Sequence, residues 1–412
     1  MVSRSDREDM LGLVAGTLLG VVLGALSGLA PGIHANTLAS ALLAAGAGLG
    51  SLLGEEGLAA AMFAALITHS FLDNIPATFL GVPDPDTALA VLPAHALCLE
   101  GRGEEAVRCS AIGSALSLCF AVPFSVACVL LLPPLQPALD WGIGILLVAV
   151  AGYLVLSSDS PGWAFGTFAV SGALGLFALR YGFLAWHTLG GDAVFLPLLS
   201  GLFGLPVLLS ASHGPVPDQH FSGISIPSGV LARHSFLGTL AGLLVGWLPG
   251  LSNATANGLL DAVVGYDRDR RGFIVATSAA NTANAFIGLA ALFALGRTRN
   301  GVMAAISGLE LPAMPVLMAA GLAAAVGGFL LTVRCARSAR HLARLDGRRL
   351  NLAVAALLVL LCLLLSGPFG LLVLCLATLV GSVPPLVNTR RVHAMGAIML
   401  PVMAWAFGFA GF

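Results

Sequence analysis

The stretch LGVVLGALSGLAPGIHANT, residues 19–37, recurs as LGTLAGLLVGWLPGLSNAT, residues 237–255, so that Leu19 aligns with Leu237 and Thr37 with Thr255. In both copies glycines recur at every fourth residue, which places them on one face of a helix and lets a second backbone approach closely. Each copy then reaches Pro-Gly, which interrupts a helix because proline lacks the amide hydrogen and glycine accepts unusual backbone angles. The repeat therefore predicts two matched helices, each closely packed and each broken at the same point.

The composition excludes a soluble enzyme and indicates a protein that is surrounded by lipid. Of the 412 residues, 58% are hydrophobic and 9% are charged, against about 25% charged in ordinary soluble domains. Apolar runs long enough to cross a bilayer recur along the whole chain, and we expect about 10 to 12 membrane segments. The expected fold is an all-α polytopic protein of the cytoplasmic membrane. A net charge of −1 argues against a nucleic-acid partner.

The repeat divides the chain into two halves. We expect a first half with additional helices at 1–210, a polar linker loop at 211–233, a second repeat core at 234–333, and a basic cytoplasmic loop with C-terminal helices at 334–412. Glu55 and Glu56 follow the first broken helix, whereas three arginines follow the second. Because arginine-rich loops face the cytoplasm, this contrast predicts that the two pseudo-symmetric halves are inverted in the membrane.

Polar residues follow each Pro-Gly break inside otherwise apolar sequence. A half-helix that starts after such a break offers free amide hydrogens and a positive dipole end, which favour an anion. Paired broken helices in two halves indicate the substrate site of a transporter. In the alternative interpretation the breaks only kink their helices, and the polar side chains bond to the freed backbone groups. The expected substrate-binding residues are Pro31, Gly32, His34, Asn36, Thr37, Pro249, Gly250, Ser252, Asn253, Thr255 and Asn257.

A second polar region follows each broken helix. Asp73 and Asn74 lie in one apolar run, and Asn281 and Asn284 lie in a later one. An ionisable group inside a span is by default a functional group, so these four residues are expected to bind the coupling ion, Na⁺ or H⁺. The alternative is that Asp73 faces water in a loop. Matches between these parts of the two halves pair Thr68 with Ser278, Asn74 with Asn284 and Glu100 with Glu310.

The segment GVPDPDTALAVLPAHALCLE, residues 81–100, is a further polar region. Asp86 and Thr87 could cap a short re-entrant helix that runs toward His95, and an ordinary loop with a helix cap is the alternative. Neither metal-ligand spacing nor a Ser/His/Asp order nor a phosphate loop accompanies these residues. We therefore expect no enzyme, no metal and no cofactor.

These motifs resemble those of a known family. PGIHANT (31–37), PGLSNATAN (249–257), GVPDPDT (81–87) and LLSGLFGLPVLL (198–209) are similar to the large membrane subunit, TctA, of tripartite tricarboxylate transporters, and closest to its shorter archaeal-type relatives. The resemblance implies secondary active transport of a small organic anion, a di- or tricarboxylate, by two related halves. It also implies two partners, a small membrane subunit and an extracytoplasmic solute-binding protein; a homo-oligomer is left open.

Two other functions remain open at this point. Pro-Gly broken helices with hydroxyl and amide groups could bind the phosphate of a polyprenyl phosphate, which would make the protein a lipid-carrier translocase. Such a substrate needs a lateral opening to lipid, whereas a soluble carboxylate needs a closed aqueous cavity. A structural membrane scaffold is the third interpretation, and the duplicated polar breaks argue against it because a bundle held only by packing has no need of them.

Overall fold

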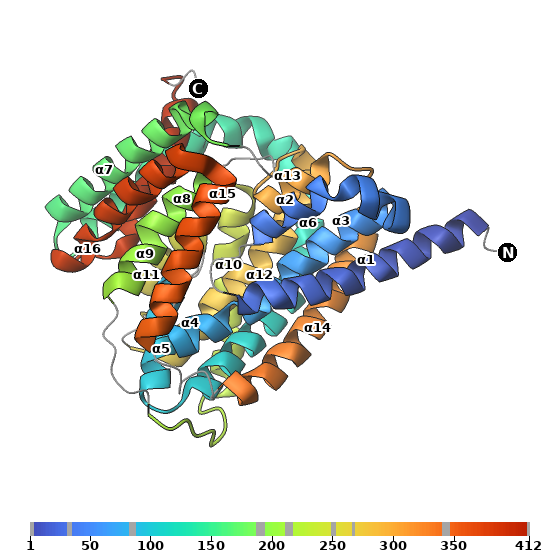
Figure 1. Ribbon diagram of the computed structural model, residues 1–412, viewed down its shortest axis with the longest axis horizontal. Helices are drawn as coiled ribbons and strands as arrows, with labels where there is room; N and C mark the ends of the chain where they lie inside the picture. Colours follow the sequence, from blue (N-terminus) through green and yellow to red (C-terminus); the bar gives the residue numbers. More distant parts are fainter. Residues whose placement is uncertain are drawn as a thin grey trace.

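The computed structural model describes residues 4–30, 35–81, 88–186, 194–210, 217–248, 253–265, 268–339 and 347–409. Within these ranges the regular elements are helices and no strand occurs (Figure 1). Eight helical stretches in the described part of the chain are long and apolar enough to cross a membrane, and two shorter apolar stretches, Asp140–Leu156 and Phe195–Gly204, accompany them. The expected all-α polytopic membrane fold is therefore confirmed.

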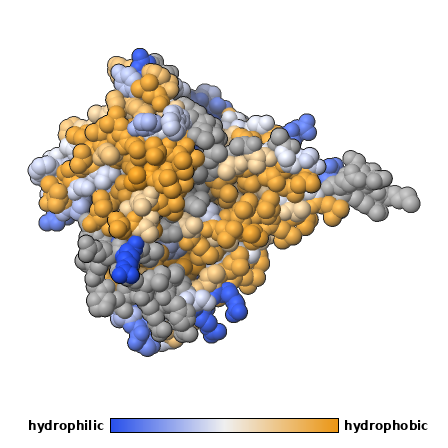
Figure 2. Space-filling view, in the orientation of Figure 1, coloured by the Kyte–Doolittle hydropathy of each residue, from blue (hydrophilic) through white to orange (hydrophobic). Residues whose placement is uncertain are grey.

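The surface agrees with a lipid environment. Figure 2 shows hydrophobic side chains across much of the visible face, with hydrophilic ones gathered mainly at its rim. Large apolar side chains project outward from several helices, including Leu26, Trp141 and Leu330. Water would penalise this exposure, whereas lipid tails do not. The molecule is an integral, multi-pass membrane protein.

The first glycine stripe packs against the helix that follows the break. α1 (Arg4–Leu29) is followed by the short α2 (Ala35–Ala44), and α3 (Gly46–Leu72) then runs parallel to α1. Each stripe glycine faces a backbone carbonyl of α3, because Gly20 lies over Ala61 and Gly24 over Ala65. A Cβ at either position would overlap that carbonyl, so only glycine allows the two backbones to approach this closely.

The glycine stripe of the second half makes the same kind of contacts as the stripe of the first half. α10 (Ser228–Trp247), α11 (Asn253–Val263) and α12 (Arg270–Leu295) repeat the arrangement, with α10 and α12 parallel and α11 between them in the chain. Gly238 lies over Ala276, and Gly242 lies over Ala280. The predicted breaks therefore fall where the structure ends α1 and α10, and the Pro-Gly residues themselves lie outside the described ranges.

These contacts correct the register between the halves. Gly24 faces the Thr68 side chain where Gly242 faces that of Ala283, so Thr68 on α3 corresponds to Ala283 on α12. The same register pairs Gly81 with Gly296, which end α4 (Asn74–Leu80) and α12 with φ of 64° each. The expected pairing of Thr68 with Ser278 is therefore wrong. That pairing matched side chains of similar polarity, whereas the register is set by the contact of each stripe glycine with a backbone carbonyl of the neighbouring helix.

One long helix of each half lies on the opposite half. α6 (Gly103–Leu156) packs on α10 and α12, and α14 (Met314–Ala339) packs on α1 and α3. Gly113 on α6 lies directly over Val275 on α12, and Gly328 on α14 lies against the Phe71 ring on α3. The shorter helices follow this exchange, since α5 (Ala88–Leu99) contacts α11 and α12 while α13 (Gly301–Ser307) contacts α2 and α3. The two halves are interlocked.

The remaining helices pack together beside this core. They are α7 (Pro161–Arg180), η1 (Gly182–Leu184), α8 (Phe195–Leu199), the π-turn η2 (Ser200–Gly204), α9 (Leu205–Ser210), α15 (Gly347–Gly381), α16 (Val383–Leu386), η4 (Arg391–Met395) and α17 (Gly396–Ala406).

The longest of these peripheral helices, α15, is two segments joined at a bend. Gly367 has a φ of 69° and is followed by Pro368, so the helix breaks there; Figure 1 shows the two arms meeting at this bend. The Trp186 ring lies against Gly367, and the Trp186 amide donates to the Ser366 carbonyl at 3.1 Å.

Candidate functional site

A chain of buried amide and carboxylate groups joins the two halves. The Asn253 amide Nδ2 donates to Asn281 Oδ1 at 2.8 Å, and Asn281 Nδ2 donates to Asp73 Oδ2 at 3.2 Å. Asn74 Nδ2 donates to the other carboxylate oxygen of Asp73 at 2.8 Å. None of the four residues is more than 8% exposed. Residues predicted for substrate binding and for ion coupling thus meet in one site.

The site lies where α3 and α12 cross in opposite directions. Along the crossing, the rings of Phe63 and Phe286 are 5.5 Å apart, Ser70 faces Thr282 at 3.4 Å, and Asp73 faces Asn281. Residue numbers rise on one helix as they fall on the other, so the helices are antiparallel.

The crossing places the Asp73 carboxylate near the middle of the membrane-crossing bundle. Asn281 lies about 16 Å along α12 from Arg270 and about 21 Å from Leu295, at 1.5 Å per residue. Asp73 itself is 6% exposed and occupies the junction between α3 and α4, where its amide still donates to the His69 carbonyl at 2.9 Å. The alternative in which Asp73 faces loop water is therefore wrong.

Sequence reasoning missed a second buried ionisable group at this junction. His69 lies one helical turn before Asp73, is 5% exposed, and places Nδ1 3.0 Å from the Ser27 hydroxyl on α1. Ser27 is the last buried polar residue before the first break. The spacing of four residues between His69 and Asp73, which puts both on one helix face, is the signal that could have identified it.

Other predicted residues lie apart from this chain of groups. Asn36 Oδ1 accepts from the Val302 amide at 3.2 Å, so its side chain helps to cap α13. His95 Nδ1 lies 2.9 Å from the Thr78 carbonyl and joins α5 to α4, and His95 itself lies within α5, the short helix that follows Thr87. Asn284 packs its backbone against Gly242 and Gly246. Asn257 is buried one turn along α11 from Asn253.

Several predicted residues fall outside the described part of the structure. Thr37 and Thr255 lie in α2 and α11, but their side chains are not described. The other residues in this group are Pro31, Gly32, His34, Asp86, Thr87, Pro249, Gly250 and Ser252.

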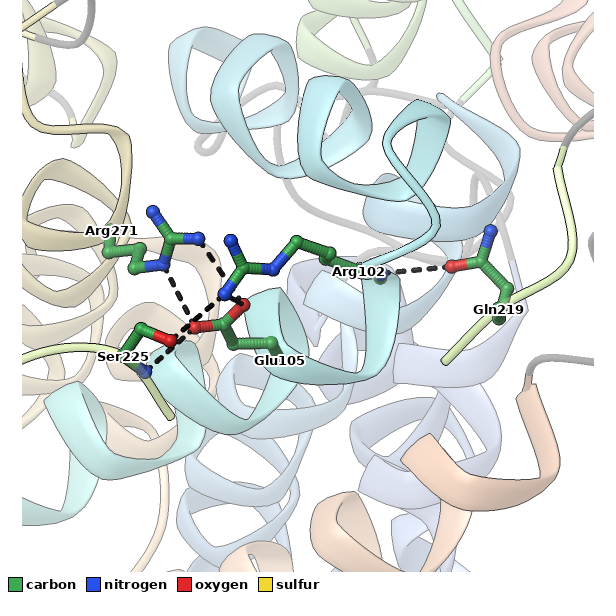
Figure 3. Close-up of polar contacts among 6 residues, drawn as sticks. Arg102, Glu105, Gln219, Ser225 and Arg271 are labelled. Atoms are coloured by element: carbon green, nitrogen blue, oxygen red, sulfur yellow. Dashed lines mark hydrogen bonds and ion pairs between the residues drawn. The ribbon is translucent and has the colours of Figure 1, made fainter. Parts of the chain in front are cut away.

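A second polar cluster, also missed, lies where α6 and α12 begin (Figure 3). Glu105 is 1% exposed, and its carboxylate accepts from Arg271 Nε at 2.9 Å and from the Ser225 amide at 2.9 Å. Arg102 Nη2 lies 2.7 Å from the same carboxylate. Gln219 Oε1 accepts from the Gly103 amide at 2.9 Å. These contacts hold the non-helical residues 217–227 against the ends of helices from both halves.

The chemistry of the central site suits a small hard cation or a proton better than a transition metal. Within the described ranges, no three His, Cys, Asp or Glu side chains lie together as metal ligands. A carboxylate and amide oxygens are the donors that hard cations prefer. Asn74 and Asn281 each donate an amide hydrogen to the Asp73 carboxylate, one to each of its oxygens.

The chain is a multi-pass helical membrane protein with two matched broken helices and a buried polar site where its halves cross. This architecture is that of the secondary transporters. The chain belongs to the tripartite tricarboxylate transporter TctA family, whose model matches residues 14–396. Over 293 residues it is 30% identical to an uncharacterized protein of Methanocaldococcus jannaschii, across 70% of this chain and 71% of that protein. No solved structure matches it.

Membership confirms the family that the sequence motifs resembled. The protein is therefore a transporter of the tripartite tricarboxylate type in general terms, and its family is one of permeases.

Proposed function

We propose that this protein moves a di- or tricarboxylate across the membrane by alternating access, driven by a gradient of Na⁺ or H⁺. The observation that carries the proposal is the chain of hydrogen bonds from Asn253 through Asn281 to Asp73. It links the helix after the second break to a buried carboxylate of the first half, so a change in charge at Asp73 acts directly on the expected substrate site.

The coupling ion binds at Asp73 in this proposal. The Asp73 carboxylate supplies the negative charge, and Asn253 Oδ1, which is buried and accepts no hydrogen bond from the described residues, supplies a further oxygen. Either a proton on the carboxylate or a sodium ion beside it would remove the charge that orients Asn281. Asn74 and Asn281 keep the empty carboxylate stable between transport steps.

The two halves are inverted repeats in this proposal. In support, α3 and α12 correspond to each other through their glycine contacts and cross antiparallel at the site. Inversion lets the same movement open one side of the membrane as it closes the other. We also propose that the chain works with the two partners of a tripartite system, a small membrane subunit and an extracytoplasmic solute-binding protein.

Uptake by the purified protein in proteoliposomes tests the function. With an imposed Na⁺ or H⁺ gradient, we expect radiolabelled di- or tricarboxylate to accumulate, and expect the same anions to raise the melting temperature of the detergent-solubilised protein. Stabilisation by short-chain polyprenyl phosphates alone would instead support a lipid-carrier translocase and would refute the proposal.

Variants locate the coupling step. Asp73→Asn should abolish gradient-driven accumulation while the protein remains folded, and Asp218→Asn, an exposed change in the segment before α10, serves as the matched control. Thr37→Val and Thr255→Val should impair uptake without unfolding the protein. Accumulation at the control rate in Asp73→Asn would exclude this residue from coupling.

A further inference from the structure

The short helix that follows the second break lies between the central site and the turn η4. α11 begins at Asn253, whose side chain donates to Asn281 in the buried chain of groups that ends at Asp73. At 3.6 residues per turn, Gly258 lies about 140° around α11 from Asn253. The face of α11 that carries Gly258 is therefore directed away from the central site, and it packs against η4.

Val392 of this turn occupies the space that a side chain at Gly258 would need. A Cβ added to Gly258 would lie 2.8 Å from Val392 Cγ2 and 3.5 Å from Leu154 Cδ2 on α6. Gly258 and Val392 are both buried, and valine is stiff because its side chain branches at Cβ. The missing side chain at Gly258 therefore allows η4 to set the position of α11 from the side opposite the central site.

An ion pair holds the far end of the same helix. Arg390 Nη1 pairs with Asp261 Oδ2, and the Asp261 side chain is 9% exposed whereas that of Arg390 is 49% exposed. Asp261 lies about 12 Å along α11 from Asn253, at 1.5 Å per residue. Arg390 and Val392 thus contact α11 at its end and at its middle, and Asn253 enters the central site from its beginning.

The turn η4 is itself firmly supported by the peripheral helices. It continues directly into α17, where Gly396 lies against the Phe168 carbonyl and the Ala397 carbonyl lies against Gly175. Phe168 and Gly175 belong to α7. A Cβ at either glycine would overlap the facing carbonyl, so α17 and α7 pack as closely as the helices of the two glycine stripes. The contacts of η4 therefore connect α11 to the peripheral helices.

We propose that Arg390 and Val392 are positioning residues for the coupling site. They hold α11 so that Asn253 reaches Asn281, and they thereby raise the affinity for the cation that binds at Asp73. The inference rests on the proposed function and deepens it, because it gives the peripheral helices a part in cation binding. In the competing interpretation η4 only fills the space beside α11 and stabilises the fold.

Gly258→Ala tests the contact with Val392. The new methyl should displace α11 and raise the half-saturating concentration of the driving cation for carboxylate uptake about fivefold, the effect of losing one hydrogen bond between neutral groups. The maximal rate should stay unchanged. Adding Val392→Ala leaves the two Cβ atoms 3.7 Å apart, an ordinary contact, and should restore the wild-type value.

Gly166→Ala is the matched control, because it adds a methyl where no heavy atom lies within 4 Å. Equal half-saturating cation concentrations in Gly258→Ala and Gly166→Ala would overturn the proposal. It would also be overturned if Gly258→Ala together with Val392→Ala failed to restore the cation dependence.

Arg390→Gln tests the ion pair and covers the case in which Gly258→Ala does not fold. It should raise the half-saturating cation concentration about two- to threefold, in keeping with a partly exposed pair, and Arg390→Lys, which keeps the charge, should restore it. Arg270→Gln breaks an exposed pair with Glu100 that does not involve α11 and serves as the control. Equal values in Arg390→Gln and Arg270→Gln would refute the positioning role.

The same uptake assay separates this inference from the function on which it rests. If the wild-type protein accumulates no di- or tricarboxylate under a Na⁺ or H⁺ gradient, the proposed function itself fails. If the wild-type protein does so and the variants match their controls, only this inference fails.

Discussion

Gly242→Ala is expected to destabilise the protein by forcing α10 and α12 apart. The new Cβ would stand 2.5 Å from the Ala280 carbonyl oxygen and 3.0 Å from Ala283 Cβ. Ordinary contacts of this kind begin near 3.4 Å, so the two backbones must separate by about 0.9 Å. Forcing an extra methyl into a well-packed contact costs about 1 to 3 kcal/mol, which should appear as a fall of a few degrees in the melting temperature of the detergent-solubilised protein.

The matched control is another glycine-to-alanine change within a membrane helix. Gly166 on α7 has no heavy atom within 4 Å of the position that a Cβ would occupy. Alanine is favoured over glycine in a helix by about 0.5 to 1 kcal/mol, so Gly166→Ala should melt at the wild-type temperature or slightly above it. If Gly242→Ala proved as stable as Gly166→Ala, the close packing of α10 on α12 would be refuted, and with it the register that relates the halves.

Two further predictions concern buried charged or titratable groups outside the membrane core. His393, in the η4 turn, is 2% exposed, and burial with the charge of Arg390 lowers its pKa from 6.5 to about 4. Between pH 7 and pH 4 this histidine becomes protonated in the unfolded chain before it does so in the folded chain, so the free energy of unfolding should fall by about 3 kcal/mol. His393→Leu should reduce the fall of the melting temperature over this pH range. An unchanged dependence of the melting temperature on pH in this variant would contradict the assignment. Glu105→Ala should cost about 3 to 5 kcal/mol because it leaves Arg271 without its buried partner. Glu100→Ala, which breaks an exposed pair with Arg270, should cost at most about 1 kcal/mol, and equal melting temperatures for the two variants would argue against a buried ion pair at Glu105.

The features that could be predicted from the sequence are those that depend on a few neighbouring residues. The glycine stripes and the Pro-Gly pairs predicted where α1 and α10 end, because helix spacing and backbone chemistry act over a few residues. Asp73 and Asn281 stood out as polar residues in apolar runs, and burial without water obliges such groups to find each other.

The features that escaped prediction depend on contacts between distant segments. The register that relates α3 to α12 follows from the backbone carbonyls that face the stripe glycines. Every residue has such a carbonyl, so the residue types do not show which ones make this contact. The hydrogen bond from the Val302 amide to Asn36 Oδ1 joins residues that are 266 apart along the chain, and no local pattern indicates it. The contacts of Glu105 with Arg271 and with the Ser225 amide also join distant segments, and nothing in the neighbouring sequence indicates them.

The interlocking of the halves bears on how such a protein could arise and move. α6 covers α12 and α14 covers α3, so one half on its own would leave its central helix, α3 or α12, uncovered on that side. Two copies of one half could cover each other's central helices. The single chain therefore has the packing of two subunits that exchange one helix each. A movement that pulled residues 1–210 away from 234–333 as blocks would tear Gly113 from Val275 and Gly328 from Phe71. The groups of helices that can shift while keeping these contacts are α1, α3 and α14 on one side and α10, α12 and α6 on the other.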